Sequence, residues 1–243
     1  MISFLEKRSG LLNWLALIGI IVLMGMIFFY APTERTMGYV QKLFYFHVGT
    51  AWVAAITFFV SLICGVLYLL RRKPILDTIS AASVEIGMAF ATMTIVSGSI
   101  WGKPAWNTYW LWSPRLTSMT ILWLVYIAYF ILRSVIHDEE RKRRFSAVYA
   151  IAGFATVIIS YGSIRVLRDI HPVMFGSSLE TAQGLEQGLQ EFSGVDSALM
   201  QNTLLAAIVV FSIIYLAWVA NRIKLDKMQN RINRVKAYIL AHE

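Results

Sequence analysis

The sequence is poor in charged residues and contains one cysteine among its 243 residues. Asp, Glu, Lys and Arg make up 15 % of the chain, whereas 58 % of the residues are hydrophobic. Because soluble domains carry about 25 % charged residues, this composition excludes an ordinary soluble protein and indicates a membrane protein. The single cysteine, Cys64, excludes an intrachain disulfide and gives no signal about the redox compartment.

The few charges are clumped, and long uncharged runs lie between the clumps. About 20 apolar residues in a helix cross a hydrocarbon core of about 30 Å. The first run is too long for the hydrophobic part of a signal peptide and no small-residue cleavage motif follows it, so we expect it in the mature protein. The sequence therefore predicts an all-α integral membrane protein with six transmembrane helices near 11–31, 43–70, 79–100, 116–133, 146–165 and 199–220.

The basic residues predict the topology. If the N-terminus is cytoplasmic, 16 of the 22 Lys and Arg residues fall in inside segments and 6 fall in outside segments. Cytoplasmic loops carry the excess of Lys and Arg, so both termini are expected in the cytoplasm and residues 101–118 form an outer, periplasmic loop. This topology also explains the net charge of +8 without a nucleic-acid partner. We expect one membrane domain, 1–220, followed by a cytoplasmic basic segment, 221–243.

The basic segment predicts an amphipathic helix. Leu225, Met228, Ile232, Val235 and Ile239 follow each other at steps of three and four, with basic residues on the adjoining face. Such a helix either lies on the anionic inner leaflet or packs against a partner helix.

At the other face of the membrane, the loop 166–198 is acidic, and a short helix is expected near 179–191. That loop is either simply solvated or a surface for a basic soluble partner.

Four of the eight tryptophans lie within the segment WGKPAWNTYWLWSPRLTS, residues 101–118. Aromatic belts at the headgroup level explain scattered tryptophans, but they explain this density poorly. Indole rings are large, flat and apolar, so a group of them could support a flat ligand, and Pro104 and Pro114 prevent one regular helix through the segment. The predicted platform consists of Trp101, Trp106, Trp110 and Trp112.

Two of the four histidines are placed where they could meet. His47 lies five residues after Lys42 at the outer end of the second span, and His171 lies six residues after Arg165, just outside the fifth. A lone interfacial histidine is usually only an amphipathic side chain. Two at one level beside an aromatic loop are candidates for the axial ligands of haem iron, whereas zinc would need three or four protein ligands.

Three cations on the same face could bind the carboxylates at the edge of such a ligand. They are Arg115, Lys103 and Lys42, with Arg168 as a fourth cation that could assist, and Arg115 is the best candidate because its fork matches a carboxylate. Ordinary pairing with lipid headgroups is the alternative for each. Glu85, inside the third span, is expected to form a hydrogen bond to a neighbouring helix.

The tryptophan segment, with KLFYFHVGTAWVA around His47 and RDIHPVMFGSS around His171, resembles the WWD domain of haem-handling proteins in cytochrome c assembly. Length, span number and the flanking histidines match the family called cytochrome c maturation protein C (CcmC), or haem exporter protein C. The resemblance implies that His47 and His171 ligate haem b and that Arg115 and Lys42 pair with its propionates. It also implies a multi-pass protein of the bacterial inner membrane, part of cytochrome c-type biogenesis and haem transport.

The resemblance further implies delivery of haem to a periplasmic haem chaperone, protein E of the maturation system. It implies association with the ABC transporter subunits A and B and with the small single-span protein D. Three residues depart from the family pattern: Ser113 replaces an Asp, Asn107 replaces a Gly, and Gly49 replaces a Pro.

Three other functions remain open on the sequence. A synthase that attaches haem to apocytochrome would share the tryptophan loop but is usually larger, with more histidines. A cytochrome b-like redox protein would place its haem ligands within spans and keep the haem permanently. A solute carrier would need polar residues at mid-membrane. No pairing of a nucleophile with a base is visible, so we expect no enzyme activity of the chain alone.

Overall fold

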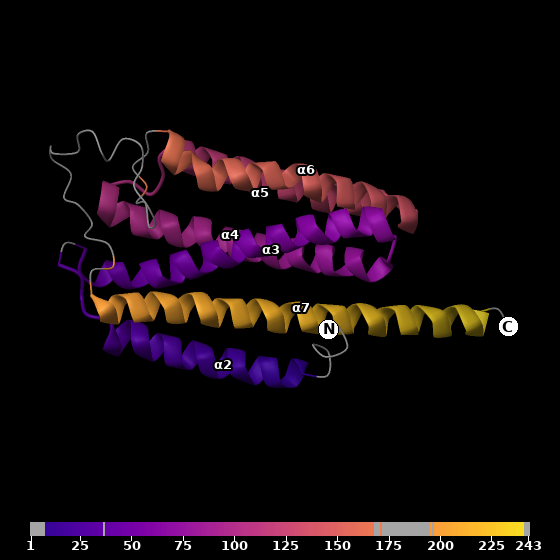
Figure 1. The fold of residues 1–243 in the computed structure, drawn as a ribbon, viewed down its shortest axis with the longest axis horizontal. Helices are drawn as coiled ribbons and strands as arrows, with labels where there is room; N and C mark the ends of the chain where they lie inside the picture. Colours follow the sequence, from indigo (N-terminus) through magenta and orange to yellow (C-terminus); the bar gives the residue numbers. More distant parts are fainter. Residues whose placement is uncertain (1–7, 36, 168–170, 172–194, 196, 241–243) are drawn as a thin grey trace.

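The computed structural model describes residues 8–35, 37–167, 171, 195 and 197–240. Within these ranges the chain forms helices that run side by side, and no strand is present (Figure 1). Six helices are long and apolar enough to cross a membrane, which confirms the predicted fold class and span number. The elements are α2 (Ser9–Gly25), the π-helical turn η1 (Met26–Tyr30), the 3-10 turn η2 (Tyr39–Gln41), α3 (Lys42–Arg71), α4 (Pro74–Trp106), α5 (Pro114–Val135), α6 (Glu139–Val166) and α7 (Ala198–Leu240).

Several helices extend beyond the apolar runs that predicted them, because capping residues rather than hydropathy set their ends. Pro74 stands in the first turn of α4, where its missing N–H leaves no bond unmade. The carboxylate of Asp138 accepts a hydrogen bond from the backbone N–H of Arg141 at 2.7 Å and so begins α6 well before residue 146. The hydropathy runs therefore locate the membrane crossing, and the caps locate the helix ends.

The sixth predicted span and the predicted amphipathic helix from 221 are joined without a break. They form α7, one continuous helix of 43 residues, and the amphipathic segment is its second half. The reason is that no Gly or Pro occurs between Ala198 and Leu240, so no residue ends the helix at the membrane boundary. At 1.5 Å per residue α7 is about 64 Å long, roughly twice the hydrocarbon thickness of about 30 Å.

The helices pack as three pairs, α2 with α7, α3 with α4, and α5 with α6 (Figure 1). α3 is central because it also contacts α6 and α7. A Cβ added at Gly49 of α3 would meet Cδ2 of Phe211 on α7 at 2.5 Å. Glycine at this position therefore has a packing reason, since small residues let membrane helices approach closely.

The bundle has two ends, a loop end and an ion-pair end. The loop end contains the start of α3, the end of α4 and the start of α5, and the ion-pair end contains the opposite ends of these helices. α2 begins and α7 ends toward the ion-pair end (Figure 1). The predicted acidic residues and short helix of the loop 166–198 fall almost entirely outside the described residues.

Ion pairs join four helices at the ion-pair end. Asp77 of α4 binds Arg133 of α5 through two hydrogen bonds of 2.7 and 3.0 Å, and Arg143 of α6 approaches the same carboxylate at 3.9 Å. Nearby, Glu85 of α4 accepts a hydrogen bond from Arg222 of α7 at 2.8 Å. This bond confirms the prediction that Glu85 bonds to a neighbouring helix.

Candidate functional site

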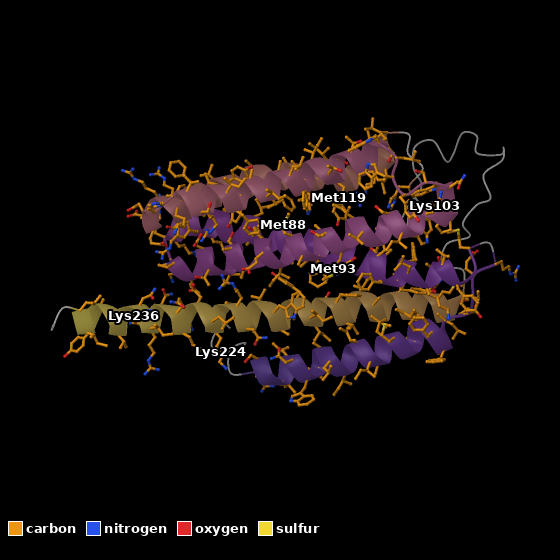
Figure 2. All side chains as sticks on the ribbon, turned by 180° about the vertical axis from the view of Figure 1, so that it is seen from behind. Met88, Met93, Lys103, Met119, Lys224 and Lys236 are labelled. Atoms are coloured by element: carbon orange, nitrogen blue, oxygen red, sulfur yellow. The ribbon has the colours of Figure 1, made fainter. Side chains whose placement is uncertain are left out.

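A cavity of about 60 Å³ lies at the loop end, among residues of α3, α4 and α5. Met119 of α5 lines it from deeper in the bundle, whereas Lys103 lies near the end of α4 and does not line it (Figure 2). Two imidazoles, three indoles and one guanidinium give the cavity its chemical character. They belong to His47, Trp101, Trp106, Trp110, Arg115 and His171.

The structure brings the two predicted histidines together. The ring centroids of His47 and His171 are 6.3 Å apart, with an angle of 41° between the ring planes. A metal–imidazole bond of about 2 Å, plus about 1 Å from nitrogen to ring centroid, places two axial imidazoles with their centroids about 6 Å apart. The observed separation matches this value, so the two imidazoles could ligate one metal ion from opposite sides.

Ser97 of α4 fixes the orientation of His47. The Ser97 hydroxyl donates to the carbonyl oxygen of Met93 at 2.7 Å, and Nδ1 of His47 lies 3.2 Å from the same hydroxyl oxygen. Because the hydroxyl proton is already donated, the tautomer that suits this contact has its proton on Nδ1, which leaves the lone pair of Nε2 for a metal. Sequence reasoning missed this residue because the contact joins positions 50 residues apart on different helices.

Gly98 provides the space in which the His47 ring lies. A Cβ added at Gly98 would meet Cε1 of His47 at 2.8 Å, which is closer than side-chain atoms pack. Any side chain at this position would therefore displace the imidazole. The sequence carried one signal for this close approach, the small residues Ser97, Gly98 and Ser99 immediately before the tryptophan segment.

Three of the four predicted tryptophans line the cavity. Trp101 and Trp106 belong to the end of α4, and their ring centroids are 5.4 Å apart at an angle of 82°. Trp110 and Trp112 form a similar pair at 5.7 Å and 80°, but Trp112 is 72 % exposed and does not line the cavity. The indoles thus form edge-to-face pairs around the site instead of the flat shelf expected from the sequence.

The indole N–H of Trp110 is buried and finds no acceptor among the described residues. Buried donors without a partner are rare because each costs free energy. Since Trp110 lines the cavity, a ligand with an acceptor atom in the cavity would satisfy this donor.

The backbone of the tryptophan segment explains two of the departures from the family pattern. Asn107 ends α4 with a φ of 57°, a left-handed conformation that Gly and Asn adopt most readily. Ser113 is the N-cap of α5, where its hydroxyl accepts from the N–H of Leu116 at 3.5 Å. Asp serves equally well at an N-cap, so the serine keeps the helix start and removes only the charge. The helix break lies between these residues, and Pro104 stands inside the last turn of α4.

Of the predicted cations that the structure describes, only Arg115 lines the cavity, and Arg168 lies outside the described residues. Its guanidinium donates to the carbonyl oxygen of Ser160 and lies 4.4 Å from the ring centroid of Tyr161, both on α6. Arg115 thus connects α5 to α6 while facing the two imidazoles. This position lets its fork bind a carboxylate on a ligand in the cavity.

Lys42 and Lys103 do not line the cavity. The Lys42 ammonium donates at 2.8 Å to the carbonyl oxygen of Phe28, in the π-helical turn η1 that follows α2. The Lys103 ammonium donates to the carbonyl oxygen of Asn107 at 2.9 Å and so closes the C-terminus of α4. Their predicted role at the edge of a ligand stays a prediction, because their contacts here are with the chain itself.

The metal-binding capacity of the site depends on the two histidines. In the described part of the chain, no three His, Cys, Asp or Glu residues gather as they would around a metal ion. The His47 and His171 pair suits an ion whose other ligands come from elsewhere, as the four nitrogens of a porphyrin do for iron.

Comparison with known proteins gives a consistent result. The family model described as "Heme exporter protein C" matches residues 2–238. Proteins of that name are similar to the chain: 33 % identical in Bradyrhizobium diazoefficiens over 184 residues, covering 73 % of this chain and 70 % of the relative. The protein from Rhodobacter capsulatus is 29 % identical, covering 70 % and 72 %. The one from Escherichia coli is 29 % identical, covering 66 % and 71 %.

Proposed function

The chain belongs to the Heme exporter protein C family, and we propose that it binds haem at the loop end and passes it to a partner protein during cytochrome c maturation. The observation that carries this proposal is the pair of imidazoles at 6.3 Å in an aromatic cavity. The named relatives support the transport of haem, and the six apolar helices support an inner-membrane location.

In the proposed complex, Nε2 of His47 and one nitrogen of His171 ligate the haem iron. Ser97 orients the first imidazole through Nδ1, and Gly98 leaves the space for its ring. Haem b fits this role because it has no covalent bond to its carrier and leaves when two axial bonds break. Arg115 binds one propionate through its guanidinium fork.

The small volume of the cavity favours a site that contacts haem along one edge and does not enclose the whole macrocycle. Pockets that enclose a drug-sized ligand have volumes of about 300–1,000 Å³, several times the 60 Å³ between these side chains. The segment between α4 and α5 therefore moves outward on binding, or the macrocycle projects past the cavity. A macrocycle that projects is accessible to a second protein, which suits a carrier that must also release its cargo.

The distribution of basic residues supports delivery of haem on the periplasmic side of the membrane. The excess of Lys and Arg lies at the ion-pair end and on the second half of α7, so that side is cytoplasmic by the positive-inside rule. The haem site then faces the periplasm, where the chaperone called protein E receives the haem. The ABC transporter subunits A and B and the single-span protein D are the proposed membrane partners. We infer a carrier that leaves haem chemically unchanged, with no enzyme activity of its own.

The direct test is the optical spectrum of the purified, haem-loaded protein in nanodiscs. His47→Ala and His171→Ala are each expected to convert a six-coordinate bis-imidazole spectrum into a five-coordinate one or to remove haem absorption. His137→Ala is the matched control, because His137 is exposed and outside the cavity. Unchanged spectra in both site variants would rule out the ligand pair.

Transfer of haem is measured by mixing the haem-loaded protein with the apo form of the chaperone. Retention of all haem by the loaded protein would contradict the carrier function.

A further inference from the structure

The last turns of α7 project beyond the ends of the other helices (Figure 1), and Figure 2 labels Lys224 and Lys236 on the second half of this helix. Every side chain from 227 to 240 is exposed. Because about 20 residues cross the hydrocarbon core and α7 begins at Ala198, the helix beyond residue 220 lies outside it. This segment is called the α7 extension, residues 221–240.

One face of the α7 extension is apolar with the spacing of a coiled coil. Its residues recur at steps of three and four, the a and d positions of heptads whose seam faces a second helix. Each of these side chains is about half exposed in the bundle. They are Leu225, Met228, Ile232, Val235 and Ile239, with exposures of 47–57 %.

The residues on both sides of the apolar face determine which helix can pair with it. In a coiled coil the e and g positions flank the seam and select partners by charge. The g positions are Lys224, Arg231 and Tyr238, and the e positions are Gln229 and Lys236. The described flanks therefore carry three positive charges and no negative charge.

Three possible occupants do not fit this face. A second copy of the chain would place cations against cations on either side of the seam, in parallel or antiparallel orientation. The inner leaflet would require the extension to lie flat, but α7 runs straight through without a Gly or Pro at which to turn. The acidic loop 166–198 precedes Ala198 and thus enters α7 at its other end, about 35 Å or more away along the helix.

Three acidic residues in the described part of the chain, toward the ion-pair end, already have partners. Asp226 accepts hydrogen bonds from Thr78 at 3.2 Å and Asn230 at 3.1 Å. Glu85 pairs with Arg222 at the start of the extension, and Glu139 pairs with Lys142 on α6. These three carboxylates therefore do not serve as the complement of the basic flanks.

We propose that the α7 extension is the docking surface for an amphipathic helix of a partner protein that carries Asp or Glu at the positions flanking its own apolar seam. The partner helix lies on the same side of the membrane as the C-terminal end of α7. Its apolar side chains cover Leu225 to Ile239, and its carboxylates pair with Lys224, Arg231 and Lys236. The surface is separate from the haem cavity, which lies at the other end of the bundle.

A photocrosslinking amino acid placed in the full-length protein in its native membrane tests this surface. At Ile232, in the seam, we expect an adduct whose crosslinked peptide belongs to an acidic amphipathic helix. The control position is Ala237, which is exposed on the opposite face of the same helix. Equal adducts at both positions, an adduct with lipid, or an adduct with a second copy of the chain would overturn the proposal.

Reversing the three positive charges beside the apolar seam tests whether the partner helix is recognised by charge or by apolar contact alone. The variant K224E/R231E/K236E keeps the apolar seam but is expected to reduce the Ile232 adduct by about tenfold, the effect of three surface ion pairs reversed in sign. The haem spectrum reports folding of the same sample and is expected to be unchanged. An adduct of wild-type intensity in a variant with an intact haem spectrum would overturn the role of charge.

Discussion

The two ends of the bundle differ in the partners of their polar side chains. At the ion-pair end, the side chains of Asp77 and Arg133 are 7 % and 21 % exposed and neutralise each other across helices. At the loop end, the cavity has two imidazoles and a guanidinium but no carboxylate among its described lining residues. Among the described residues, one end therefore pairs carboxylates with guanidinium groups, whereas the cavity at the other end offers N–H donors and ligating nitrogens that suit an anionic, metal-containing ligand.

This difference assigns separate tasks to the two ends. The ion pairs hold α4, α5 and α6 together without a ligand. At the loop end, the Ser97 hydroxyl orients the His47 ring through Nδ1, which leaves Nε2 available as a metal ligand. Substitutions at one end are thus expected to change stability, and substitutions at the other to change haem binding.

Asp77→Ala is the largest test of this separation. Removing the carboxylate leaves Arg133 and Arg143 without their shared partner, and breaking a buried ion pair costs about 3–5 kcal/mol. The free energy of unfolding, measured by denaturant titration in detergent, should fall by that amount. The bis-imidazole spectrum of the protein that stays folded should not change.

The control for Asp77 is Glu139→Ala. Glu139 is 62 % exposed and pairs with Lys142 at the surface, so its loss should cost at most about 1 kcal/mol. If Asp77→Ala altered the haem spectrum at full stability, the division of tasks between the two ends would be wrong.

Arg115→Gln is the second test, now at the loop end. A charged hydrogen bond contributes about 1.5–3 kcal/mol, so loss of the guanidinium should weaken haem affinity by more than about tenfold. Lys103→Gln should change affinity little, because Lys103 does not line the cavity and bonds to Asn107. Affinity is measured by titrating the apo protein with haem. Equal losses in the two variants would show that the cavity does not define the propionate site.

Ser97→Ala is expected to have a smaller effect on the same titration. Loss of a residue that orients a metal-ligating histidine lowers affinity by about 10–100-fold, and we expect about tenfold because a hydroxyl is a weak acceptor. The low-spin signals of the oxidised haem in electron paramagnetic resonance should also broaden or shift as the ring loses its orientation.

Ser212→Ala is the matched control for Ser97. The Ser212 hydroxyl bonds to the carbonyl of Ile208 in its own helix at 2.7 Å, as Ser97 bonds to Met93. It lines no part of the cavity. If haem affinity changed no more in Ser97→Ala than in Ser212→Ala, the proposed role of Ser97 in orienting His47 would be wrong.

Sequence reasoning predicted the level of each residue along the bundle better than its direction around the helix axis. Hydropathy gave the six spans, and the basic residues near His47 and His171 placed both histidines at one level, where the structure has them in contact. Level alone cannot say which way a side chain points. Trp112 and Lys103 are at the right level, yet neither lines the cavity.

The contacts that sequence reasoning missed depend on how helices pack. Ser97 and Gly98 act on His47 across the α3–α4 interface, and Asp77 meets Arg133 from 56 residues away. No periodic pattern in the chain encodes such pairs, because each depends on the rotation of two helices. The continuity of α7 was readable from the absence of Gly and Pro, but the change from apolar to basic residues at 220 suggested a boundary there.

The smallest expected effect concerns Glu85 and Arg222, which resemble the Asp77 pair in chemistry but not in burial. Their side chains are 54 % and 46 % exposed, so a double-mutant cycle of Glu85→Gln and Arg222→Gln should give a coupling energy of about 0.2–1 kcal/mol. The unfolding free energies of the two single variants and the double variant measure it. A coupling near that of the Asp77 pair would mean that lipid shields this bridge as protein shields Asp77, and that the ion-pair end extends along α7. A coupling within the expected range means that the strong ion pairing is confined to α4, α5 and α6 and that α7 is held to the bundle mainly by its apolar contacts.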